Sequence, residues 1–135
     1  MKYFKNIEFN GTFFRWGLIT LLVVVSIQTC ADVFNWYYIF PHLDTPMHIL
    51  GGMLVGFFAL AYTSKGMSSI EKLIWVIIWS IVIGILVEVV EWSIDSWAHL
   101  GVMLQQNTLD TYTDILHDFV GGTFAFILGY FTKRI

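Results

Sequence analysis

The stretch that decides the fold is Asp110-Thr-Tyr-Thr-Asp114-Ile-Leu-His117-Asp118-Phe-Val-Gly121-Gly122, which runs into an apolar tail. On a helix, positions 110, 114, 117, 118 and 121 fall on one face. The segment therefore looks like a membrane span whose first half carries three carboxylates and an imidazole. Because each ionisable group at membrane depth costs roughly 2.5–3.5 kcal/mol on insertion scales, we expect these groups to belong to a functional site.

The composition is that of an integral membrane protein. Of the 135 residues, 57% are hydrophobic and 13% are charged, and the mean hydropathy is +0.71. A soluble domain of this length could not bury so much apolar surface. The sequence predicts an all-α fold in which residues 1–135 form a single membrane domain. We expect an integral membrane four-helix bundle with spans at about 12–31, 45–63, 73–94 and 111–131.

The basic residues all lie toward one end of this predicted bundle. Four spans place both termini on the same side of the membrane. All seven Lys and Arg residues fall near the termini or in the 64–72 loop, whereas the 32–44 and 95–110 connections contain none. Because Lys and Arg are enriched in cytoplasmic loops, the N and C termini are predicted to be cytoplasmic. The predicted location is the cell (inner, cytoplasmic) membrane, which the chain would cross several times.

Polar residues also mark the outer halves of the second and third predicted spans. In the second, Asp44 and His48 lie four residues apart on one face, ahead of a glycine pair. The stripe in the third comprises Ser80, Gly84, Glu88, Glu91 and Asp95. At a rise of 1.5 Å per residue, Asp118 lies about 12 Å from Asp110 and Glu88 about 10 Å from Asp95, so these faces can meet at one depth. The first span offers Ser26, Thr29 and Cys30 and is expected to act as a wall.

These stripes predict a metal site that opens toward the extracytoplasmic side. The candidate metal ligands are Asp44, His48, Glu88, Glu91, Asp114, His117 and Asp118, with Asp110 at the mouth. So many carboxylates cannot all stay ionised in a low dielectric, so they must bind protons or a cation. Carboxylate and imidazole ligands suit a divalent metal ion, namely Mg²⁺, Mn²⁺, Fe or Zn²⁺. Asp114-x-x-His117 and Glu88-x-x-Glu91 partly match the spacing of di-metal sites in helix bundles.

Structural interpretations compete with this one at each residue. Asp44 could simply cap its helix. Glu88 and Glu91 could be protonated hydrogen-bond donors, and His117 and Asp118 could form a hydrogen-bond network without a metal. The sequence leaves these alternatives open.

Two of the polar segments share a pattern. Asp44-x-x-x-His48-x-x-Gly51-Gly52 and Asp114-x-x-x-Asp118-x-x-Gly121-Gly122 have the same spacing over nine positions. The predicted second and fourth spans also run in the same direction. The pattern suggests two helical hairpins related by a pseudo-two-fold axis along the membrane normal, with the glycine pairs allowing close approach of the backbones.

At these residues the sequence resembles the VanZ-like family and, more closely, the YjdF-like bacterial membrane proteins. The resemblance covers roughly residues 40–130 and rests on three motifs kept in order: Asp44-Thr-Pro-Met-His48-Ile-Leu-Gly-Gly, Glu88-Val-Val-Glu91-Trp92, and Asp110-Thr-Tyr-Thr-Asp114 through Gly121. It implies a small polytopic membrane fold and the location of the site, and it implies no particular reaction.

Three functions fit the pattern. The first is a metal-dependent membrane hydrolase or transferase that acts on a membrane lipid or a lipid-linked small molecule, with His48 or His117 as the catalytic ligand or general base. The second is a proton or cation pathway. The third is a non-catalytic accessory or binding protein in which the polar cluster is structural. No basic stripe points to nucleic acid, and small-residue faces permit a homodimer.

Overall fold

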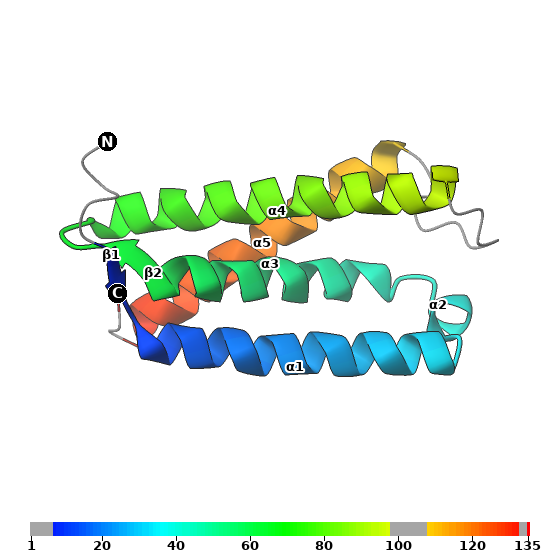
Figure 1. Cartoon of the computed structure of the whole chain (residues 1–135), viewed down its shortest axis with the longest axis horizontal. Coiled ribbons are helices and arrows are strands. Elements are labelled where there is room, and N and C mark those ends of the chain that lie inside the picture. The colour runs from blue at the N-terminus through cyan, green and yellow to red at the C-terminus, as the bar shows by residue number, and fades with distance from the viewer. Residues whose placement is uncertain (1–6, 98–107, 133–134) are drawn as a thin grey trace.

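The structure is a computed structural model that describes residues 7–97, 108–132 and 135, without the side chains of Asp95 and Thr108. Its elements in chain order are β1 (Ile7–Phe9), α1 (Gly11–Val33), α2 (Trp36–Ile39), α3 (Asp44–Ala61), β2 (Tyr62–Ser64), α4 (Ser69–Trp97) and α5 (Thr108–Phe131). The protein is thus almost entirely helical, with one short strand pair (Figure 1).

Helix α3 lies at the centre and contacts α1, α4 and α5. In Figure 1, α4 and α1 flank α3 on opposite sides, and α5 crosses behind it. Helices α3 and α5 run in the same direction, opposite to α1 and α4. The N-terminal ends of α3 and α5 therefore meet the C-terminal end of α4 at one end of the molecule, which we call the acidic end. The other end, where α1 begins and α5 ends, is called the terminal end.

Glycines form a close seam between α3 and α5. A Cβ atom on Gly52 would collide with the backbone carbonyl of Asp118, and one on Gly121 would collide with the backbone carbonyl of Ile49. Farther along, a Cβ on Gly56 would lie 2.8 Å from the Cβ of Ala125. The two copies of the shared sequence pattern thus lie side by side and parallel, with backbones too close for any residue but glycine at these positions.

The terminal end contains a small sheet that an all-α fold does not include. β1 and β2 pair antiparallel, with Ile7 opposite Ser64 and Phe9 opposite Tyr62. The predicted second span, to residue 63, therefore ends two residues early at Ala61, because the chain then extends to pair with β1. The Oδ1 atom of Asn10 accepts hydrogen bonds from the next helix's backbone N–H groups at Thr12 and Phe13, which caps α1.

The third span is longer than predicted, and its start has a local cause. Ser68 and Glu71 form a capping box: the Glu71 N–H donates to Ser68 Oγ at 3.3 Å, and the Ser68 N–H donates to Glu71 Oε2 at 2.7 Å. Helix α4 accordingly begins at Ser69 rather than at residue 73.

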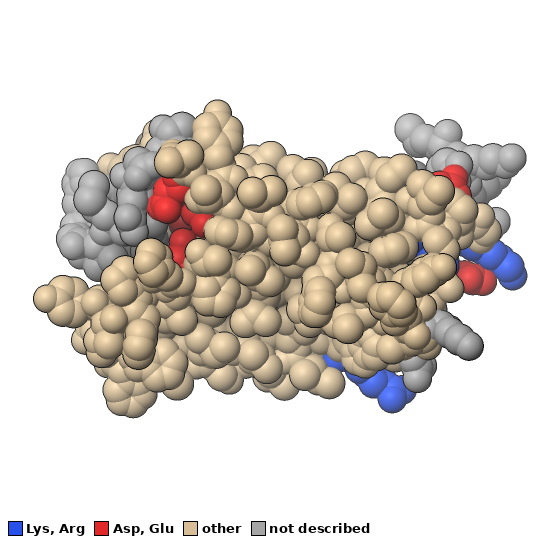
Figure 2. All heavy atoms as spheres, turned by 180° about the vertical axis from the view of Figure 1, so that it is seen from behind, with Lys and Arg blue, Asp and Glu red and all other residues tan. Residues whose placement is uncertain are grey.

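Among the described residues, three helices are long and apolar enough to cross a membrane: Gly11–Val33, Asp44–Ala61 and Ser69–Ile94. Helix α5 falls outside this set, and its first half carries Asp110, Asp114 and Asp118. Large apolar side chains stay exposed along the helices, such as Leu22 and Val90. In Figure 2, uncharged residues cover the middle of the molecule, while Lys and Arg gather at the terminal end.

Candidate metal centre

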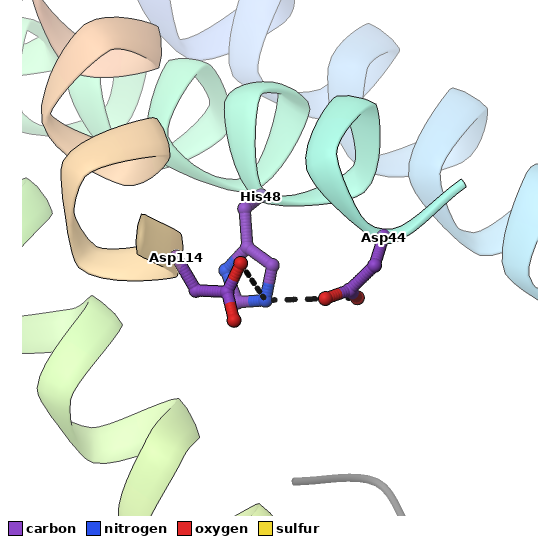
Figure 3. Close-up of side chains that lie close together, drawn as sticks. All are labelled: Asp44, His48 and Asp114. Atoms are coloured by element: carbon purple, nitrogen blue, oxygen red, sulfur yellow. Dashed lines mark ion pairs between the residues drawn. The ribbon is translucent and has the colours of Figure 1, made fainter. Parts of the chain in front are cut away.

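His48 of α3 is the centre of the acidic end. Its side chain is buried, and its Nε2 atom faces carboxylates from three helices. The Oδ1 atom of Asp44, one turn earlier on α3, lies 3.7 Å away, and Glu88 Oε1 of α4 and Asp114 Oδ1 of α5 each lie 4.0 Å away. Figure 3 shows Asp44 and Asp114 on either side of the imidazole. The first turn of α3 and the outer parts of α4 and α5 therefore converge on one imidazole nitrogen.

The other nitrogen of His48 has a different neighbour. Its Nδ1 atom lies 3.4 Å from Oδ2 of Asp118, which is within hydrogen-bond distance. Asp118 follows Asp114 by one turn on α5, so the two carboxylates flank the imidazole at different depths. The ring is thus contacted through both of its nitrogens.

Burial makes this cluster costly. Glu88 is 4% exposed, and Asp114 and Asp118 are each 5% exposed. Removing several carboxylates from water costs several kcal/mol per ion unless opposite charge or protons compensate. One imidazole can supply at most one positive charge. The cluster must therefore hold additional protons or a cation.

The donor atoms have the spacing that a metal ion requires. Two groups each bring one donor atom per residue within 4.8 Å of one another: Asp44, His48 and Asp114 form the first, and His48, Glu88 and Glu91 form the second. Because metal–donor distances are about 2.0–2.6 Å, donors on opposite sides of one ion lie about 4–5 Å apart. The residues present therefore fit a divalent ion, and His48 belongs to both groups.

His117 lies at the edge of this arrangement and is in neither group. Its Nδ1 atom is 3.7 Å from Oδ1 of Asp114. That nitrogen is buried and has no hydrogen-bond partner among the described residues, although the side chain as a whole is 26% exposed. The structure thus places His117 beside a candidate ligand rather than among the converging donors.

The capping interpretation of Asp44 is wrong. The residue at the N-cap position of α3 is Leu43, and among the described residues no side chain caps this helix. Asp44 lies inside the first turn, and its carboxylate faces His48. Its negative charge still suits the N-terminal end of a helix dipole. Of the other predicted polar positions, the side chain of Asp95 lies outside the described residues.

The first span contributes more than a wall, which the sequence analysis missed. The Tyr37 hydroxyl of α2 donates to Gln28 Oε1 of α1 at 2.6 Å, and Gln28 Nε2 donates to Asp32 Oδ1 at 3.0 Å. Burial raises the pKa of the Tyr37 phenol, and the negative charges of Asp44, Asp32 and Glu91 act in the same direction, against the Gln28 hydrogen bond. Tyr37 therefore stays a protonated donor next to the acidic cluster. The spacing of Gln28 and Asp32, four apart on a helix, was the available signal.

The three polar residues that the sequence offered in the first span do not join the cluster. Ser26 is exposed, and the Thr29 hydroxyl donates to the Val25 carbonyl of its own helix at 2.7 Å. Cys30 is a free, partly buried thiol. These three residues are accordingly part of the helix surface, not of the cluster.

The fold and the site define a helical membrane protein with a buried carboxylate–histidine cluster. A family model described as "Predicted membrane protein (DUF2238)" matches residues 5–134. Because the match covers nearly the whole chain, the protein belongs to this family and is a membrane protein. Comparisons with curated proteins and with solved structures found no match. The family description states no activity.

Proposed function

We propose that this protein is a four-span protein of the inner membrane whose carboxylate–histidine cluster binds a divalent metal ion and acts on a lipid or lipid-linked substrate, as a hydrolase or transferase. The observation that carries the proposal is the convergence of carboxylates from α3, α4 and α5 on Nε2 of His48. Membership of the VanZ-like or YjdF-like group stays a prediction that this site supports. Assembly into a homodimer also stays a prediction.

The length and packing of α5 support a fourth span. Its 24 residues extend about 36 Å at 1.5 Å per residue, which exceeds the roughly 30 Å of a bilayer's hydrocarbon core. It packs along both α3 and α4, and its Asp114 and Asp118 side chains are buried and face His48 of α3. The described basic residues Arg15, Lys65 and Lys72 lie toward the terminal end, which supports cytoplasmic termini and an outward-facing acidic end.

The metal ion would be held either by Asp44, His48 and Asp114 or by His48, Glu88 and Glu91. When bound, a divalent ion polarises a phosphoryl or carbonyl oxygen or lowers the pKa of a water ligand. Carboxylate-rich sites favour Mg²⁺ or Mn²⁺, and the imidazole also admits Fe or Zn²⁺. His117, with its buried Nδ1 atom beside Asp114, is placed to serve as a general base at the edge of the site.

The position of the cluster supports a lipid substrate. It lies at the end of the bundle where lipid headgroups would be, next to the aromatic segment of α2. An apolar cavity of about 370 Å³ lies farther along α3 and α4, lined by residues that include Leu54, Phe58, Trp79 and Ile83. Ile83 precedes Glu88 by five residues, about 8 Å along the helix axis. A headgroup at the cluster could therefore have its acyl chain along the same two helices.

Metal analysis of the purified protein tests this proposal. We expect the wild-type protein, equilibrated with Mn²⁺ or Zn²⁺ in detergent or nanodiscs and then dialysed, to retain at least one ion per chain by mass spectrometry of the metal. His48→Ala should lose the ion, because His48 belongs to both donor groups. Loss in Asp114→Asn as well would assign the ion to the group formed by Asp44, His48 and Asp114. The matched control is Glu8→Gln, which removes a carboxylate that pairs with Lys65 at the exposed terminal end.

Retention of less than one ion by the wild-type protein with every added metal would contradict the proposal. The cluster would then be held by protons alone, as in a structural or accessory protein. Equal retention by wild type and His48→Ala would show that the ion binds elsewhere, because His48 belongs to both donor groups.

A further inference from the structure

We propose that Asp118 is a positioning residue and not a metal ligand: it accepts a hydrogen bond from Nδ1–H of His48 and thereby directs the lone pair of Nε2 to the metal. This inference rests on the proposed metal site and assigns different roles to the two carboxylates that α5 places around His48. Asp114 would bind the ion, while Asp118 would orient the imidazole.

The two sides of the imidazole differ in geometry. Nδ1 lies 3.4 Å from Asp118 Oδ2 in a hydrogen-bonding arrangement. Nε2 faces the carboxylates of Asp44, Glu88 and Asp114 at 3.7–4.0 Å, which is too long for direct hydrogen bonds and leaves room for an ion between them. An ionised carboxylate only accepts hydrogen bonds, so contact with Asp118 favours the tautomer with its proton on Nδ1.

The groups of potential ligands separate the residues in the same way. Both groups include His48 together with two carboxylates, and neither includes Asp118. Asp118 is nevertheless as deeply buried as Asp114, at 5% exposed. A buried carboxylate that does not share the donor positions needs another reason to be there, and the hydrogen bond to His48 supplies one.

Glycines from two helices leave the space that Asp118 occupies. A Cβ atom on Gly84 of α4 would collide with Asp118 Oδ2, the same oxygen that contacts His48. Gly52 of α3 admits the Asp118 backbone in the same way. The carboxylate thus occupies space that any larger residue at position 84 would fill. Gly51, by contrast, has room: its Cβ would lie 3.5 Å from Asp118 Oδ1, an ordinary contact distance.

A hydrogen bond from the second nitrogen of a metal-bound histidine fixes its tautomer and ring orientation and raises its basicity. Loss of such a partner typically weakens metal binding by about 10–100-fold without abolishing it. A lost ligand and a lost positioning residue therefore have different signatures, because the positioning variant keeps every donor atom.

Metal titration separates the two roles. We expect Asp118→Asn and Asp118→Ala to bind Zn²⁺ at unchanged stoichiometry but with a Kd raised about 10–100-fold, with the smaller effect for Asn because its carbonyl oxygen can still accept. Gly84→Ala should weaken binding similarly although all polar residues remain. Gly51→Ala is the matched control and should bind as the wild type does. An unchanged Kd in both Asp118→Ala and Gly84→Ala would overturn the positioning role.

Nitrogen NMR of the Zn²⁺-loaded, ¹⁵N-histidine-labelled protein provides a readout that a merely structural role would not alter. His48 should show a proton on Nδ1 and the metal on Nε2, and the Nδ1–H signal should be lost to exchange with water in Asp118→Ala. Metal on Nδ1 would overturn the inference while leaving the metal site intact. Failure of the wild type to bind Zn²⁺, Mn²⁺ or Mg²⁺ would instead overturn the proposed function.

Discussion

The two ends of the molecule bury opposite kinds of side chain. At the terminal end the core is apolar, formed by residues such as Phe13, Phe57 and Leu60. Polar groups there meet backbone partners: Asn10 caps α1, and Trp75 Nε1–H donates to the Ala59 carbonyl at 3.2 Å. At the acidic end the buried groups are an imidazole and three carboxylates. The first arrangement is satisfied within the protein, whereas the second needs protons or an ion. That difference is the reason for proposing a functional site at the acidic end.

Both ends depend on glycines at the contacts between helices. Near the terminal end, Gly56 lets the helices pack against Ala125. Near the acidic end, Gly52 and Gly84 make the space that Asp118 occupies. Small residues thus serve helix packing at one end and the placement of charge at the other.

The largest loss of stability is expected from adding a side chain where the backbones of α3 and α5 are closest. In Gly121→Ala, the new Cβ would collide with the Ile49 backbone carbonyl, and a backbone atom cannot move aside as a flexible side chain can. We expect a cost above the roughly 1–3 kcal/mol of ordinary overpacking, so that both ends are lost together. Size-exclusion profiles and thermal unfolding in detergent would measure this, with Gly11→Ala as the control. A Gly121→Ala variant as stable as the wild type would contradict the close backbone approach of α3 and α5.

A pair of substitutions compares the two ends directly in metal-free protein. Phe57→Ala removes a buried ring that packs edge-on against Trp16, with 5.4 Å between the ring centroids. We expect the free energy of unfolding to fall by on the order of 3 kcal/mol. Glu88→Gln removes a buried ionisable group at nearly constant volume, so stability should be unchanged or higher. Unfolding by denaturing detergent after chelation measures both. A loss in Glu88→Gln as large as in Phe57→Ala would show that the acidic end is structural.

Removing the cap of α1 tests the hydrogen bonds that stabilise the terminal end. Asn10→Ala deletes the acceptor for the N–H groups of Thr12 and Phe13, and we expect a loss of about 1 kcal/mol. Asn10→Asp should retain the cap and most of the stability. Metal content should be unaffected in both variants, since the cap lies at the opposite end from His48. A change in metal content here would show that the two ends are coupled.

The smallest effect is expected at Tyr37. Because its pKa is raised above the ordinary value of 10.0 in the folded protein, the folded state holds the phenolic proton more tightly than the unfolded state does. Its contribution is complete below pH 10 and is lost as the pH rises through the raised pKa. The stability of wild type relative to Tyr37→Phe should therefore fall above pH 10, as followed by unfolding at a series of pH values. A relative stability that rises in that range would contradict the assigned environment.

Much of the helical architecture follows from the sequence, because long apolar runs and polar stripes at helical spacing are local signals. The convergence of α3, α4 and α5 could also be predicted, since the polar stripes place Asp118 and Glu88 at similar depths along their helices. Glu88 and Asp114 both face His48 in the structure. Whether they bind an ion stays a prediction.

The rest depends on contacts between distant segments. The β1–β2 pair joins residues 7–9 to residues 62–64, and neither segment has a strand pattern long enough to recognise. The position of the Asp118 carboxylate depends on the space that Gly84 of α4 leaves open. The polar stripe of α5 alone does not reveal that space. Tyr37 belongs to an aromatic segment that composition assigns to the headgroup region. The sequence does not reveal its hydrogen bond to Gln28 or its proximity to the charges of Asp44 and Glu91.

The most direct test is the anomalous scattering of a crystal of the wild-type protein grown with Mn²⁺ or Zn²⁺. We expect a peak at the acidic end, about 2.0–2.6 Å from His48 Nε2 and from carboxylate oxygens of Asp44 and Asp114 or of Glu88 and Glu91. A map without a peak among these residues, at a metal concentration that saturates other sites, would contradict the proposed metal centre.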